Sequence, residues 1–183
     1  MRELSLNILD IVMNSVEAEA TRIIIALDEL KSVNLLSVRI KDNGRGMSDE
    51  LVQRVLDPFV TTRTTRSVGM GLSMFRQIAR QCGGDLQIFS APGIGTLVRT
   101  TFRLNNLNLP PIGKMSDSIV NLFIGSIDVH FYYAHKTDHG QFGFDSYWLF
   151  ARMAEKECQL VDTVPHAKEY LNRQLQTIKS RAT

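Results

Sequence analysis

The sequence has little cysteine and almost no net charge. Only two of its 183 residues are cysteine, Cys82 and Cys158, and their wide separation excludes a disulfide framework and the paired spacing of a zinc or redox site. Lysine and arginine number 21 against 19 aspartate and glutamate, which gives a formal net charge of +2. We therefore expect buried or free thiols in a reducing compartment and no nucleic acid partner.

Long hydrophobic runs are also missing. The longest, residues 23–27 and 119–124, are far shorter than the roughly 20 residues of a membrane-spanning helix. Residues 1–15 carry acidic and amide side chains inside their apolar pattern, which a signal peptide does not. These features predict a cytoplasmic protein without a membrane partner.

The hydrophobic pattern predicts one α/β layer in the first 104 residues, a two-layer α+β sandwich with helices on one face of a mixed sheet. Glycine and proline separate the expected elements, and residues 60–68 have no useful periodicity. The expected order is helix, two strands, helix, loop, helix and two strands, at residues 4–18, 23–27, 35–41, 48–56, 60–68, 69–82, 86–90 and 96–104.

Residues 105–113 form a linker by composition, with Pro110 and Pro111 side by side, and a small α/β unit is expected over residues 114–183. Its predicted helix, two strands and two helices lie at 116–125, 128–135, 141–145, 147–159 and 165–179. Strand alternation would place His130 and His135 on opposite faces, which disfavours a metal site.

An aromatic-rich stretch lies within this second unit. Aromatic side chains dominate core burial, so a core role is favoured, and a protein-docking or dimer face remains the alternative. Its members are Tyr132, Tyr133, Phe142, Phe144, Tyr147 and Trp148.

Polar residues form a stripe on the first predicted helix. Asn7, Asp10, Asn14 and Glu17 follow at intervals of three and four residues, which places them on one helical face. The stripe could be the solvent face of an amphipathic helix. An asparagine beside an aspartate also supplies the oxygen ligands that Mg²⁺ prefers.

Three glycine-punctuated segments follow along the chain. Asp42 precedes Gly44 and Gly46, where a carboxylate could accept from an exocyclic amine and the glycines would let the backbone approach a flat ring. Gly69 and Gly71 open a helix, whose N–H groups favour phosphate. The third segment is Gly93-x-Gly95-Thr96. Each segment alone could be an ordinary turn, loop or hairpin, but their order and spacing together are specific.

Together these segments resemble the GHKL superfamily of gyrase, Hsp90, histidine kinases and MutL, which share the Bergerat ATP-binding fold. The resemblance covers a little over half of the chain. Residues 9–18 are similar to the N box, with a MutL-like continuation, and the later segments are similar to histidine kinases. The corresponding G1 box, F box with lid start, G2 box and closing hairpin lie at residues 42–46, 57–63, 69–73 and 83–96.

The resemblance implies that the chain binds ATP and Mg²⁺. It assigns Asn14 to the metal ion, Asp42 to the adenine amino group, and Thr96 to the water network near adenine. The pocket wall and hinge would be Gly44, Gly46 and Met47, the lid would contain Thr61, Thr62 and Arg63, and the phosphate-facing amides would belong to Gly69, Gly71 and Leu72.

Three departures from the superfamily pattern affect the expected activity. Asp10 stands where gyrase- and MutL-like members have a glutamate general base, and a displacement of about 1 Å can cost on the order of 10²-fold in rate. Hydrolysis is therefore expected to be slow. Glu19 replaces a MutL-like glycine, so the helix end is expected to turn differently. The lid at residues 60–68 is short and is expected to need a partner to cover the phosphates.

The position of the histidines bears on kinase activity. The first helix begins at Leu4 and every histidine lies beyond residue 129, so self-phosphorylation from an upstream hairpin is not expected. The resemblance implies a nucleotide-dependent regulator of a protein partner, or a homodimer, with slow ATP hydrolysis. Two alternatives remain: a kinase acting in trans, like anti-sigma kinases, and a degenerate scaffold that binds no nucleotide.

Overall fold

The computed structural model describes residues 3–56, 71–155 and 160–183. The predicted F box and lid, with Thr61, Thr62, Arg63 and Gly69, lie outside these residues. Within the described ranges no helix has both the length and the hydropathy needed to cross a membrane.

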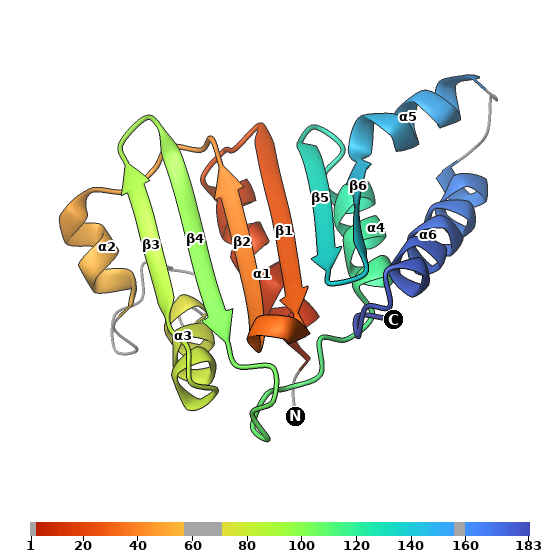
Figure 1. The fold of residues 1–183 in the computed structure, drawn as a ribbon. Helices are drawn as coiled ribbons and strands as arrows, with labels where there is room; N and C mark the ends of the chain where they lie inside the picture. Colours follow the sequence, from red (N-terminus) through yellow and green to blue (C-terminus); the bar gives the residue numbers. More distant parts are fainter. Residues whose placement is uncertain (1–2, 57–70, 156–159) are drawn as a thin grey trace.

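A six-stranded mixed sheet organises the molecule (Figure 1). The strand order is β3-β4-β2-β1-β5-β6. β1 pairs with β5 in parallel, and the other neighbouring pairs are antiparallel. The strands are β1 (Arg22–Leu30), β2 (Leu35–Asp42), β3 (Leu86–Ala91), β4 (Gly95–Phe102), β5 (His130–Thr137) and β6 (Gly140–Asp145). A short 3₁₀ turn, η1 (Lys31–Val33), joins β1 to β2.

The long helices lie on one face of this sheet, and their apolar sides bury its inward-facing residues in a single core (Figure 1). The helices are α1 (Leu4–Glu17), α2 (Asp49–Val55), α3 (Gly71–Gln81), α4 (Met115–Gly125), α5 (Ser146–Glu155) and α6 (Leu160–Thr177). The predicted two-layer α/β architecture, with helices on one face of a mixed sheet, is confirmed.

A local sequence signal sets the start of α2, whereas the start of α6 departs from its signal. Ser48 caps α2 by accepting from the Leu51 N–H, as its position before Asp49 and Glu50 predicts. The prediction for α6 was wrong at its start. The helix begins at Leu160, so Pro165 lies inside it instead of occupying the first turn, where a missing N–H costs least.

The end of α1 also corrects an expectation. Glu19 adopts a left-handed conformation with φ of 60°, the conformation that a glycine would take at this position. The Ala20 N–H then donates to the Ser15 carbonyl, and the Glu19 N–H donates to that of Val16. The helix therefore ends as it would with glycine, at the steric cost of a side chain in the left-handed region.

The C-terminal strands extend the sheet of the first 104 residues, because β5 pairs with β1 from Arg22 to Glu29. The predicted linker packs against α1: the carbonyls of Pro111 and Ile112 accept from the Leu4 and Ser5 N–H groups. The division into separate units at residues 1–104 and 114–183 stays a prediction.

The aromatic-rich stretch divides between core and surface. Tyr133 and Phe144 are buried, whereas Tyr132, Tyr147 and Trp148 are exposed. Alternation along β5 explains the split, since Tyr132 and Tyr133 point to opposite faces. The same alternation places His130 and His135 on opposite faces, as predicted.

Candidate functional site

Asp42, at the end of β2, is held by three hydrogen bonds from three different segments. Its Oδ1 accepts from the Gly44 N–H at 2.9 Å and from the Thr96 N–H at 3.1 Å. Its Oδ2 accepts from the Ser15 hydroxyl of α1 at 2.7 Å. A carboxylate can accept about four hydrogen bonds. Among the described residues this leaves Asp42 Oδ2 with one acceptor position for a ligand.

Glycine is required where the turn after Asp42 meets its neighbours. A Cβ on Gly46, whose φ is +67°, would lie 1.9 Å from the Ala91 carbonyl oxygen. A Cβ on Gly95 would lie 2.2 Å from the Asp42 carbonyl oxygen. These contacts are too close for any side chain, so the turn after β2 and the β3–β4 hairpin pack directly backbone to backbone.

The same turn is anchored to the end of α1. The Arg45 N–H donates to the Ala18 carbonyl, and a Cβ on Gly44 would lie 2.7 Å from that oxygen. Asn43 Oδ1 accepts from the Thr21 and Arg22 N–H groups at the start of β1. The position of Asp42 therefore depends on α1, β1 and the β3–β4 hairpin together.

α1 also connects Asp42 to the beginning of α3. Ser15 contacts Asp42, and one helical turn or so earlier Asp10 packs beside Gly71, whose added Cβ would lie 3.8 Å from the Asp10 Cβ. Asp10 and Asn14 are four residues apart and share a helical face. From Asp10 to Ala18 the helix rises about 12 Å. The predicted base-binding segment thus lies at the C-terminal end of α1, and the predicted phosphate-binding segment lies beside the middle of the same helix.

Met47 and Thr96 join this arrangement through Ser90. The Met47 N–H donates to the Ser90 hydroxyl oxygen at 2.8 Å, and that oxygen lies 2.9 Å from Thr96 Oγ1. The Ser90 hydroxyl donates to the Gly95 carbonyl. These bonds fix the residue after the G1-like turn to the closing hairpin.

Two of these residues, Ser15 and Ser90, were not predicted from the sequence. Ser15 had a detectable signal, because it continues the buried face of Ile8 and Ile11 at helical spacing, where a polar residue needs a partner. Ser90 had no such signal. Asn7, predicted within the polar stripe, is buried and donates to the Glu3 carbonyl, so the stripe is not a uniform solvent face.

A family model described as "Histidine kinase-, DNA gyrase B-, and HSP90-like ATPase" matches residues 1–106. This range contains all the site residues described above, from Asp10 on α1 to Thr96 on β4.

Individual relatives match over the same part of the chain. The signal transduction histidine-protein kinase AtoS of Escherichia coli is 30% identical over 99 residues, which is 54% of this chain and 16% of AtoS. The nitrogen regulation protein NtrY of Azorhizobium caulinodans is 35% identical over 77 residues, 42% of this chain and 10% of NtrY. The chain thus spans a small part of these relatives.

A solved structure described as the N-terminal domain of a DNA repair protein is also similar. It aligns with 79% of this chain and 52% of its own, with a TM-score of 0.49 and 17% sequence identity.

Proposed function

Because the chain belongs to the family of histidine kinase-, DNA gyrase B- and HSP90-like ATPases, we propose that it binds Mg²⁺-ATP and uses its nucleotide state to regulate a protein partner in the cytoplasm. The proposal covers residues 1–106, where the family match lies, and includes slow hydrolysis with Asp10 as the general base.

The hydrogen bonding of Asp42 carries the proposal. Three donors from three segments orient a buried carboxylate and, within the described ranges, leave one acceptor position on Oδ2. The exocyclic amine of adenine is a donor of the complementary kind. Gly44, Gly46 and Gly95 let the backbone segments around this carboxylate pack directly against one another, which fixes the position of the carboxylate.

Asp10, near the middle of α1, and Asn14, one turn later, fit the charged part of the ligand. Asn14 and Asp10 present oxygen atoms on one helical face, and Mg²⁺ takes oxygen ligands while keeping several waters. The ion would supply neutralisation of phosphate charge. In this proposal Asn14 holds the ion, the N–H groups of Gly71 and Leu72 at the start of α3 face the phosphates, and Asp10 accepts a proton from water.

Transfer of the phosphoryl group to a separate protein is the second candidate. It is favoured by the similarity to AtoS, which is described as a histidine-protein kinase. In that case Asp10 would orient a protein side chain in place of water.

Incubation of the full chain with γ-labelled ATP, with and without a bacterial lysate, separates these candidates. Released labelled phosphate from the purified chain supports the ATPase. Label on a lysate protein that is lost with an Asp42→Asn chain supports the kinase.

A thermal shift measured with Mg²⁺-ATP tests the scaffold alternative. At a ligand concentration of 100 Kd the unfolding free energy should rise by about 2.7 kcal/mol. Absence of any shift at saturating nucleotide would refute the proposed function and leave a scaffold.

A further inference from the structure

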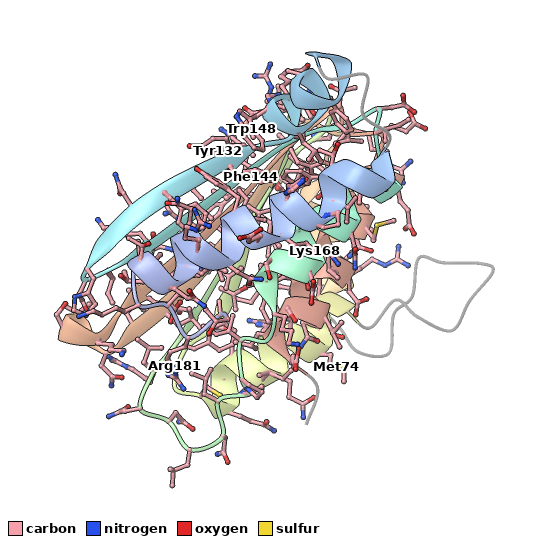
Figure 2. All side chains as sticks on the ribbon, turned by 90° about the vertical axis from the view of Figure 1, so that its right-hand side faces the viewer. Met74, Tyr132, Phe144, Trp148, Lys168 and Arg181 are labelled. Atoms are coloured by element: carbon pink, nitrogen blue, oxygen red, sulfur yellow. The ribbon has the colours of Figure 1, made fainter. Side chains whose placement is uncertain are left out.

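One whole face of the sheet carries no helix in the described part of the chain. Figure 2 views the molecule along the sheet from the β6 edge, with α6, α4, α1 and α3 on one side. Alternation along the strands directs every second side chain to the opposite side, here called the open face. The open face is therefore an unpartnered surface built from at least four adjacent strands.

Basic residues outnumber acidic ones on the open face. Its carboxylates are Asp28 and Asp145, and Asp145 lies at the edge strand, 2.9 Å from His130 Nε2. Its basic side chains, all exposed, are Arg22, Arg39, Lys41, Arg99 and Lys136. This excess is larger than the formal net charge of +2 for the whole chain, so positive charge is concentrated here.

The arrangement of these charges lowers the stability of the sheet when no ligand is bound. Arg39 and Arg99 are directly opposite each other on the antiparallel strands β2 and β4, where like charges are destabilising. Asp28 Oδ2 pairs with Arg39 at 2.8 Å, whereas Arg99 and Lys136 have no carboxylate within 4 Å among the described residues. An acidic ligand would relieve this repulsion.

A groove of about 640 Å³ crosses the open face beside these charges. Its floor is a row of small residues in register on three strands, Ala26, Ala134 and Gly143. Tyr132 lies over the Gly143 end of this floor, since its hydroxyl oxygen lies 2.1 Å from where a Gly143 Cβ would be. Arg39 and Lys136 line the same groove, together with Asp28, the ion-pair partner of Arg39. The groove thus combines a floor of small residues, an aromatic side chain and basic side chains at its rim.

We propose that the open face binds an acidic segment of a partner protein, which places a bulky apolar side chain in the groove and carboxylates against Arg39, Arg99 and Lys136. Charge complementarity selects this occupant. Single-stranded nucleic acid fits less well, because the exposed aromatics Tyr132 and Phe89 are four strand spacings apart, roughly 19 Å, too far for successive bases to stack.

Binding of a fluorescent poly(Glu,Tyr) copolymer to the full chain tests this inference, with poly-Glu and oligo-dT as comparison probes. The double variant Arg99→Glu/Lys136→Glu should weaken copolymer binding by about tenfold or more, and added salt should weaken wild-type binding. Ala134→Leu should fill the groove and reduce the preference for the copolymer over poly-Glu. Circular dichroism checks that each variant is folded.

The matched control is Lys114→Glu/Arg173→Glu, which makes the same charge change away from the open face. It should bind the copolymer like the wild type. The inference is overturned if the wild-type chain does not bind the copolymer, if both double variants lose binding equally, or if oligo-dT binds more tightly than the copolymer.

Discussion

At the level of single residues, the Ser15 side chain helps to orient the Asp42 carboxylate. Its hydroxyl is the donor that approaches Oδ2, the oxygen proposed to accept from the ligand. Hydrogen bonds to charged groups contribute about 1.5–3 kcal/mol. Removing this one should let the carboxylate rotate within the site.

The variant Ser15→Ala is therefore expected to bind Mg²⁺-ATP about tenfold more weakly, measured by isothermal titration calorimetry. The control Ser118→Ala removes a buried serine of α4, which has no contact with Asp42. Unchanged affinity in Ser15→Ala would show that Asp42 does not need this donor.

Thr100 offers a second test at this scale. Its Oγ1 is buried and has no hydrogen-bond partner in the described part of the chain. A buried hydroxyl without a partner is destabilising, and valine has nearly the same shape. Thr100→Val should raise the unfolding free energy by about 1 kcal/mol in urea denaturation. A loss of stability would mean that the hydroxyl is bonded after all.

The sequence predicts Asp42 and its glycines as candidate site residues, because their residue types and spacing are characteristic. It did not reveal that Ser15, Thr96 and Gly44 all donate to one carboxylate. That convergence depends on how α1 packs against the ends of β2 and β4, which residue types alone do not specify.

At the scale of helices and strands, the conformation at the end of α1 lowers the unfolding free energy by a measurable amount. Glu19 has φ of 60°, and a non-glycine residue in this region costs about 1 kcal/mol or more. Glu19→Gly should therefore raise the unfolding free energy by about 1 kcal/mol, measured by urea denaturation. Met13→Gly, made at an exposed position within the helix, should instead lower it by a similar amount, about 1 kcal/mol. Equal effects of the two changes would contradict this explanation.

Element types were predicted well where apolar periodicity and caps were clear, as in α1 and α2. The start of α6 was missed because proline at a helix start is the common pattern, and nothing local indicates that the helix runs through Pro165. The parallel pairing of β1 with β5 was also not predicted. It joins Arg22 to His130, and such distant partners leave no local signal.

At the scale of the whole molecule, a buried polar cluster fastens the C-terminus to the sheet. Glu29 Oε1 accepts from His135 Nε2 at 2.7 Å and from the Ser180 hydroxyl, and Oε2 accepts from the Arg181 N–H. Tyr133 Oη lies 2.5 Å from His135 Nδ1. The cluster joins β1, β5 and the segment after α6, so its loss should loosen the whole C-terminal part.

Protonation of Glu29 should weaken this attachment. Burial raises the pKa of Glu29, but the hydrogen bonds from His135 and Ser180, the charge of His135 and the Arg181 N–H outweigh it and lower the pKa below its ordinary 4.5. A lowered folded-state pKa stabilises the fold above the unfolded pKa. That stability is lost as the pH falls from 4.5 through the folded-state pKa.

We therefore expect the unfolding free energy of the wild type to decline below pH 4.5. Glu29→Gln should cost about 3 kcal/mol at neutral pH, since it breaks a buried pair, and should show a smaller decline in acid. Urea denaturation across this pH range measures both. Parallel pH profiles for the two proteins would exclude Glu29 as the group responsible.

The most direct measurement of the central claim is calorimetric titration of Mg²⁺-ATP into the wild type, Asp42→Asn and Asp10→Asn. The account predicts that Asp42→Asn, still folded by circular dichroism, loses detectable binding because its amide nitrogen cannot accept from the adenine amine. Asp10→Asn should bind as the wild type does and lose phosphate release. Wild-type affinity in Asp42→Asn would contradict the account.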